Sequence, residues 1–297
     1  FNRRITAHTP FRLSGPVAGH ELVRTEADPD GTTVLGTLNN CSGGMTPWGT
    51  VLSGEENFHQ YFVGAPDTQE HVRYGLPTDY SGRRWDRIEE RFDLAKHPNE
   101  ANRFGYIVEI DPHDPDSVPV KRTMLGRFKH EGANVNLTKD GRVAAYMGDD
   151  ERFDYIYKFV SAKKYVEGSR SHNMSLLDSG TLYVGRLTGN SPEEEIDGSG
   201  TLPEDGAFDG TGEWVPLCSN TKSFVDGFDV AEVLVHTRLA ADAVGATKMD
   251  RPEDFEPSPV TGKVYCALTN NDAREPRTGR RTQPTQSQQA RPHPGDR

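Results

Sequence analysis

Short strand-like runs that each end in a turn are the feature of this sequence that most constrains its fold. They lie at 33–38, 49–53, 104–110, 121–128, 134–137, 142–147, 155–160, 180–187, 212–217 and 264–268. Between two of them stands Lys139-Asp140-Gly141, and Asp-Gly between β-rich runs is a strong hairpin signal. Strands at this spacing predict an all-β fold, a propeller or a sandwich. The pattern favours a propeller. The sequence does not show the strict repeat of roughly 40–50 residues that would establish one.

The composition supports many turns and limits the partners of the chain. It has 297 residues, of which 30 are Gly and 20 are Pro, and these residue types favour turns between short strands. Its formal net charge is −11. Because nucleic acids and anionic membranes attract basic surfaces, we expect neither as a partner. Acidic clusters suit hard cations such as calcium instead. The 3 Cys, an odd and sparse count, argue against a disulfide scaffold.

The sequence divides into three parts. Residues 1–30 are polar and predict a segment that leads into the fold or an edge strand. Residues 31–272 carry the strand-like runs, whereas residues 273–297 are rich in Arg, Gln and Pro and are expected to be disordered. Within the middle part, residues 64–102 predict a long loop with one helical turn, the kind of insertion that often covers a site. Apolar residues at helical spacing, followed by a glycine, predict one helical insertion at 229–244.

The ends and the hydropathy of the chain set two further expectations. The chain begins with Phe1, so we expect its natural N-terminus, with any export signal, to lie upstream. No run of about 18 apolar residues is present, so no transmembrane segment is expected.

One stretch, 39–57, combines a thiol with a pair of carboxylates. Cys41 lies among small residues, where a lone cysteine is usually a buried small hydrophobe. A thiolate there could instead bind a soft metal or act as a nucleophile. Glu55 and Glu56 follow a strand-like run, so one carboxylate can face inward and the other outward, or both can bend towards one cation. A solvated acidic turn is the alternative.

Three further clusters offer charged groups without an evident structural purpose. His130-Glu131 suits a metal ligand with a supporting neighbour, or a satisfied pair at a strand end. Asp149-Asp150-Glu151 places three carboxylates between two strands, where they repel one another unless water or cations neutralise them. A simple acidic hairpin tip is the alternative. Arg251-Pro252-Glu253 offers an arginine suited to bidentate contact with a phosphoryl group, although a salt-bridged turn is the commoner explanation.

Taken in order, these segments resemble the PhoX-type alkaline phosphatases. The resemblance rests on NNCSGGMTPWGTVLSGEEN (39–57), GRFKHEGANV (126–135), AAYMGDDERFDYIYKFVSA (144–162), GTLYVGRL (180–187), GEWVPL (212–217) and RPEDFEPSPVTGKVYCALTNN (251–271). The blocks cover most of residues 30–271, and together they are far more specific than any one of them. Because the match ends near Asn271, we expect a propeller that is incomplete at its C-terminus.

The resemblance implies a β-propeller that hydrolyses phosphate monoesters at a mixed centre of ferric iron (Fe3+) and calcium (Ca2+). It implies that Cys41 is the thiolate ligand of iron in the catalytic centre and that Arg251 binds the phosphate. The carboxylate ligands that it implies are Glu55, Glu56, Glu131, Asp149, Asp150, Glu151 and Glu253. It also implies a periplasmic or secreted bacterial enzyme, exported by the twin-arginine route. We expect small-molecule phosphoesters as its partners and a monomer as its assembly state.

Other functions remain open on the sequence alone. One is a calcium-dependent propeller lactonase. Another is a non-catalytic propeller that binds calcium and serves as an interaction scaffold, or an inactive truncated product. Metal content separates these functions, since calcium without iron would favour the lactonase or the scaffold.

Overall fold

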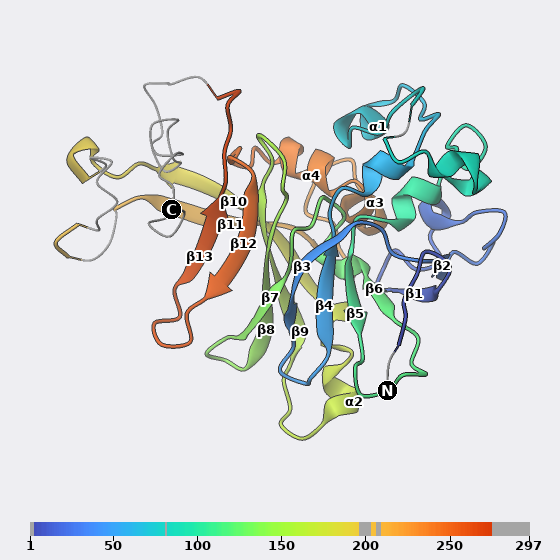
Figure 1. Cartoon of the computed structure of the whole chain (residues 1–297). Coiled ribbons are helices and arrows are strands. Elements are labelled where there is room, and N and C mark those ends of the chain that lie inside the picture. The colour runs from blue at the N-terminus through green and yellow to red at the C-terminus, as the bar shows by residue number, and fades with distance from the viewer. Residues whose placement is uncertain (1–2, 81, 196–202, 206–208, 275–297) are drawn as a thin grey trace, which may run out of the picture.

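A computed structural model describes residues 3–80, 82–195, 203–205 and 209–274 of the chain, and strands in three sheets make up most of its regular structure (Figure 1). In spatial order, the six-stranded sheet contains β2 (Thr33–Leu35), β1 (Pro10–Ser14), β6 (Val120–Arg122), β5 (Ile107–Ile110), β4 (Val51–Glu55) and β3 (Asn40–Met45). The five-stranded sheet contains β11 (Thr211–Ser219), β10 (Gly180–Gly189), β9 (Ile156–Lys164), β8 (Arg142–Gly148) and β7 (Asn134–Leu137). The third sheet pairs β12 (Pro252–Pro257) with β13 (Val264–Leu268).

Strands at the edges of the three sheets bring the sheets together. β3 contacts β7, and β12 contacts both β7 and β8. Every strand pair in the sheets is antiparallel except β1 with β6, which is parallel. The predicted Asp-Gly hairpin is confirmed, since Leu137 of β7 pairs with Val143 of β8 and Gly141 has a φ of 84°. The strand-rich class predicted from the sequence is therefore confirmed, with open sheets and no closed barrel among the described residues.

Short helices lie outside the sheets. The α-helices are α1 (Gln69–Arg73), α2 (Arg170–Asn173), α3 (Val230–Val235) and α4 (Thr237–Ala243). The 3-10 turns are η1 (Glu21–Val23), η2 (Phe58–Tyr61), η3 (Trp85–Arg87), η4 (Glu90–Phe92), η5 (Glu100–Arg103), η6 (Thr123–Leu125), η7 (Leu176–Asp178) and η8 (Glu193–Glu195). Within the described residues, no helix has both the length and the apolar character needed to cross a membrane.

The predicted helix at 229–244 is confirmed as two short helices, α3 and α4. Asp229 and Glu232 form a capping box at the start of α3, in which each side chain accepts a hydrogen bond from the backbone amide of the other. The helix is interrupted at His236, whose φ of −110° and ψ of 42° are not helical. Gly245, with a φ of 68°, follows the end of α4 in the left-handed conformation typical of a helix end.

The structure differs from the sequence-based expectation at several places. Within residues 1–30, β1 lies inside the large sheet, between β2 and β6, rather than at its edge. The strand predicted at 121–128 ends at Arg122, and η6 begins at the next residue, Thr123. The segments around Cys41 and Glu253, where no strand was predicted, form strands β3 and β12. Of the tail 273–297, expected to be disordered, all but the first two residues lie outside the described part of the chain.

Candidate metal centre

Two glycines allow the segments that carry the candidate centre to approach one another closely. A Cβ atom on Gly54 would lie 2.4 Å from the carbonyl oxygen of His130, and one on Gly148 would lie 2.2 Å from that of Pro252. A side chain at either position would therefore collide with the facing backbone. The end of β4 thus lies against the segment before β7, and the end of β8 against the start of β12.

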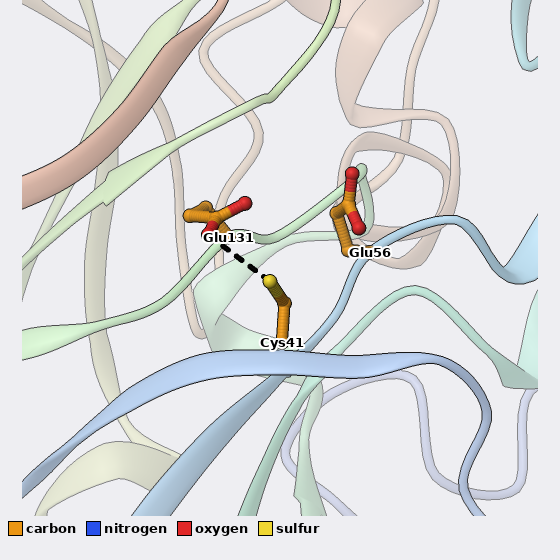
Figure 2. A group of neighbouring side chains, drawn as sticks. All are labelled: Cys41, Glu56 and Glu131. Atoms are coloured by element: carbon orange, nitrogen blue, oxygen red, sulfur yellow. Dashed lines mark hydrogen bonds between the residues drawn. The ribbon is translucent and has the colours of Figure 1, made fainter. Parts of the chain in front are cut away.

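Three side chains from distant parts of the sequence converge at this junction. The donor atoms of Cys41, Glu56 and Glu131 all lie within 4.8 Å of one another (Figure 2). Cys41 is on β3, Glu56 follows β4, and Glu131 precedes β7. The Sγ atom of Cys41 donates a hydrogen bond to Oε1 of Glu131 at 3.0 Å. One thiol and two carboxylates at this spacing form a possible metal-binding group.

Asp150, Arg251 and Glu253 lie beside this group. Asp150 follows β8 and is buried, and its Oδ2 accepts a hydrogen bond from Nη2 of Arg251 at 2.8 Å. Its Oδ1 is also buried and has no hydrogen-bond partner among the described residues. The same Arg251 nitrogen lies 3.4 Å from Oε1 of Glu253. The arginine is therefore held between two carboxylates, one of which has a free oxygen.

Burial and mutual repulsion oppose ionisation of the converging groups. Burial, followed by the charges of Asp150 and Glu131, raises the pKa of Glu56 to about 7. Burial also raises the pKa of Glu131, and the charges of Glu253 and Asp150 act in the same direction. Partial burial and the hydrogen bond to Glu131 raise the pKa of the Cys41 thiol to about 12. A cation bound among these groups would favour their ionised forms.

The structure places Glu55, predicted as a metal ligand, outside this group. Its carboxylate is fully buried and pairs with Nζ of Lys121 at 2.7 Å. It also accepts hydrogen bonds from three backbone amides, those of Leu38, Gly105 and Tyr106. Adjacent residues at a strand end point to opposite sides, so Glu56 reaches the candidate centre while Glu55 reaches the core. Glu55 is a structural anchor in this arrangement.

Asp149 and Glu151, also predicted as ligands, are each neutralised by a basic residue. Arg238 donates two hydrogen bonds to the fully buried Asp149, at 2.7 Å and 2.5 Å. Lys129 lies 2.5 Å from the carboxylate of Glu151. Burial acts to raise the pKa of Glu151, but the hydrogen bond and charge of Lys129 outweigh it and lower that pKa to about 2. Of the three consecutive carboxylates, only Asp150 keeps an unpartnered buried oxygen.

Sequence interpretation missed two residues of the site, Lys129 and Asn39. Lys129 lies two positions before Glu131, and its charge acts on both Glu56 and Glu151. Asn39 donates a hydrogen bond from Nδ2 to Oε2 of Glu56 at 3.2 Å. Both residues stand inside the sequence blocks already described, but neither is a typical metal ligand, so ligand chemistry gave no signal for them.

Backbone conformation supports the same location. Asn39 has a φ of 49° and Arg251 a φ of 53°, in the left-handed region that non-glycine residues rarely adopt. Strained backbone of this kind gathers at functional sites, where the surrounding structure holds it in place. The two residues flank the candidate centre, one next to Glu56 and the other next to Asp150.

Comparisons with known proteins find a matching family model and a similar solved structure. The sequence matches the family model described as Alkaline phosphatase PhoX over residues 1–295. A similar solved structure is Pseudomonas fluorescens PhoX in complex with vanadate, a transition state analogue. The two chains share 49% sequence identity and superpose with a TM-score of 0.82, over 91% of this chain and 46% of that chain. This chain thus spans about half the length of that relative. No curated protein gives a match.

Proposed function

Since this chain belongs to the alkaline phosphatase PhoX family, we propose that it hydrolyses phosphate monoesters at a metal centre held by Cys41, Glu56 and Glu131. The convergence of these three donors is the observation that carries the proposal. They come from three separate segments and meet where the sheets join. Family membership supports the reaction type, because the related Pseudomonas protein was solved with a transition state analogue bound.

The donor set fits a centre of ferric iron and calcium. A thiolate with carboxylates suits ferric iron, and additional carboxylate oxygens suit calcium. Asp150 and Glu253 supply such oxygens, and the unpartnered Oδ1 of Asp150 supports a role as a ligand. Glu55, Asp149 and Glu151, each held by a basic residue, are left out of the proposed ligand set. When bound, such metal ions polarise the phosphoryl oxygens and absorb charge that develops in the transition state.

Arg251 is the proposed phosphate-binding residue. Its guanidinium is fixed by Asp150 and Glu253 through one nitrogen, and its side chain is 33% exposed. Arginine carries five N–H donors in a planar fork, so donors remain for an incoming phosphoryl group. Two donors on the equatorial oxygens would orient the ester and stabilise the negative charge of the transition state.

Turnover of p-nitrophenyl phosphate tests the proposal. We expect Cys41→Ala and Arg251→Ala each to lower kcat/KM by roughly 100-fold or more, since each removes a group that acts on the transition-state charge. Cys218→Ala and Arg186→Ala are matched controls. Cys218 lies on β11 and Arg186 on β10, and neither strand carries a proposed ligand. Unchanged turnover in both site variants, with normal circular dichroism, would refute the assignment of Cys41 and Arg251 to the active site.

The wider architecture and location are proposed on the same basis. The three sheets are proposed as blades of a β-propeller, with β3, β7 and β12 as their inner strands, because β7 contacts both β3 and β12. The substrates are proposed as small-molecule phosphoesters and the protein as a monomer, which light scattering after gel filtration would test. Periplasmic or secreted location, by twin-arginine export, is proposed from the family and is tested by cell fractionation.

A further inference from the structure

Arg83 places a positive charge at the edge of the candidate centre. Its Nη2 donates a hydrogen bond to Oδ1 of Asn39 at 3.3 Å. The Nδ2 of that same amide donates to Oε2 of Glu56 at 3.2 Å. One amide group therefore links an exposed guanidinium to a proposed metal ligand. Arg83 belongs to the insertion 64–102, which the sequence predicted to cover a site.

Asn39 is held firmly enough to fix the position of this link. Its backbone carbonyl accepts a hydrogen bond from the amide of Glu56 at 3.2 Å, and its side chain binds the carboxylate of the same residue. Its φ of 49° is a conformation that asparagine adopts more readily than most residues. Since both its backbone and its side chain are bound to Glu56, the amide offers Arg83 a defined anchor beside the centre.

Arg83 has donors left for a ligand. Of its five N–H donors, one binds the Asn39 amide, and within the described part of the chain it forms no ion pair with a carboxylate. Its guanidinium lies 5.7 Å from the ring centroid of Tyr61. Tyr61 in turn packs edge-on against Trp85, with ring centroids 4.9 Å apart. The aromatic pair supports one side of the guanidinium, and the exposed side remains open to an anion.

We propose that Arg83 binds a second anionic group on the substrate. The preferred substrates are then phosphate monoesters whose leaving alcohol carries a carboxylate or another phosphate. This inference rests on the proposed function, in which Arg251 and the metal ligands take the phosphoryl group that is hydrolysed. Arg83 is exposed and lies beyond Asn39 from the buried Glu56, so the proposal places the departing part of the substrate beside it.

Matched substrates test this role. Glycerol 3-phosphate and 3-phosphoglycerate differ by a carboxylate on the leaving alcohol. Fructose 6-phosphate and fructose 1,6-bisphosphate make the same comparison for a second phosphate. In at least one pair, we expect wild type to have the higher kcat/KM for the member with the additional anionic group. The pair that shows this preference identifies whether Arg83 binds a carboxylate or a phosphate. Arg83→Gln should reduce that preference by about threefold to tenfold, as for an exposed charge-assisted contact.

Two further variants separate a specific role of Arg83 from a general effect of surface charge. Arg83→Lys should recover part of the preference, because it keeps the charge and loses the fork. Arg84→Gln is the neighbouring control, since its guanidinium lies 5.2 Å from the ring centroid of Tyr80, and it should leave the preference unchanged. An equal preference in wild type and Arg83→Gln would overturn the inference while leaving phosphatase activity in place.

Absence of turnover would contradict the proposed function instead. In that case, calorimetric titration of the metal-loaded protein with 3-phosphoglycerate and glycerol 3-phosphate still decides the role of Arg83. If wild type binds 3-phosphoglycerate more tightly than glycerol 3-phosphate and Arg83→Gln loses this difference, the role of Arg83 is supported. Equal binding of each compound by both proteins refutes it.

Discussion

Asp149 and Asp150 are neighbours in the chain and have opposite roles. Asp149 is fully buried and neutralised by Arg238, whereas Asp150 keeps a free oxygen at the candidate centre. Glu55 and Glu56 repeat this division at the end of β4. Because successive side chains at a strand end point to opposite sides, one acid of each pair anchors the segment in the core while the other faces the site. The paired acids thus position the proposed metal ligands.

The buried ion pair of Glu55 and Lys121 gives a test of this division. Glu55→Gln leaves the Lys121 ammonium, which is fully buried, without its counter-charge, so we expect a loss of about 3–5 kcal/mol in unfolding free energy. The double variant Glu55→Gln/Lys121→Met should lose less. Urea unfolding measures both. Metal content per folded chain should stay at the wild-type level in the double variant, and a large loss of metal would show that Glu55 is itself a ligand.

Lys121 also predicts how stability changes with pH. Burial lowers its pKa from 10.5 to about 8. Between these two values the unfolded chain binds more protons on this lysine than the folded chain does. The contribution of Lys121 to the unfolding free energy therefore rises as the pH rises through this window. Urea unfolding at about pH 7 and about pH 10 should show wild type gaining stability relative to the double variant, which lacks the lysine. A constant difference would argue against a depressed pKa.

At the scale of elements, β3 and β12 carry side chains of the candidate centre on strands that have little hydrophobic pattern. β3 contains Cys41 and has no fully buried residue, and β12 contains Glu253 and buries only Pro252 and Phe255. Hydrophobic alternation arises where one face of a strand packs against the core. These two strands pair with β4 and β13 while their side chains face the junction of the sheets.

Gly148 tests the close approach of β8 and β12. A Cβ atom there would meet the carbonyl of Pro252, so Gly148→Ala should push β12 outward and separate Glu253 and Arg251 from Asp150. We expect a stability loss of about 1–3 kcal/mol together with loss of metal and of turnover. Gly180→Ala is the matched control, because its Cβ would lie 2.2 Å from the carbonyl of Val160, in the β9–β10 pair. Equal metal content in the two variants would contradict the account.

The sequence predicted best the strands that turn residues bound, and it predicted the site only through the family resemblance. The runs that became β7, β8, β10 and β13 were found at or within two residues of their ends, because turn residues such as Gly141 and Gly262 bound runs that favour strands. The carboxylate clusters were also visible. What could not be predicted is which acid of each cluster has a basic partner, since Lys121 and Arg238 reach Glu55 and Asp149 from 66 and 89 residues away.

At the scale of the whole molecule, the candidate centre depends on contacts between sheets. Cys41 belongs to the six-stranded sheet and Glu56 follows its strand β4. Glu131 leads into the five-stranded sheet, and Glu253 belongs to the two-stranded one. Each sheet alone would hold too few donors to bind a metal tightly. The chain spans 46% of the related Pseudomonas protein, and this half includes the thiol, the carboxylates and the arginine that the proposal uses.

Iron and calcium content per folded chain is the measurement that tests the central claim most directly. Elemental analysis of wild type, Cys41→Ala and Cys218→Ala after mild purification makes the comparison. We predict that wild type and Cys218→Ala contain both metals, and that Cys41→Ala loses iron by roughly tenfold or more, because loss of a ligand should cost at least as much as loss of a supporting partner. The same iron content in Cys41→Ala as in wild type, or no iron in any of the three, would contradict a metal centre held by Cys41, Glu56 and Glu131.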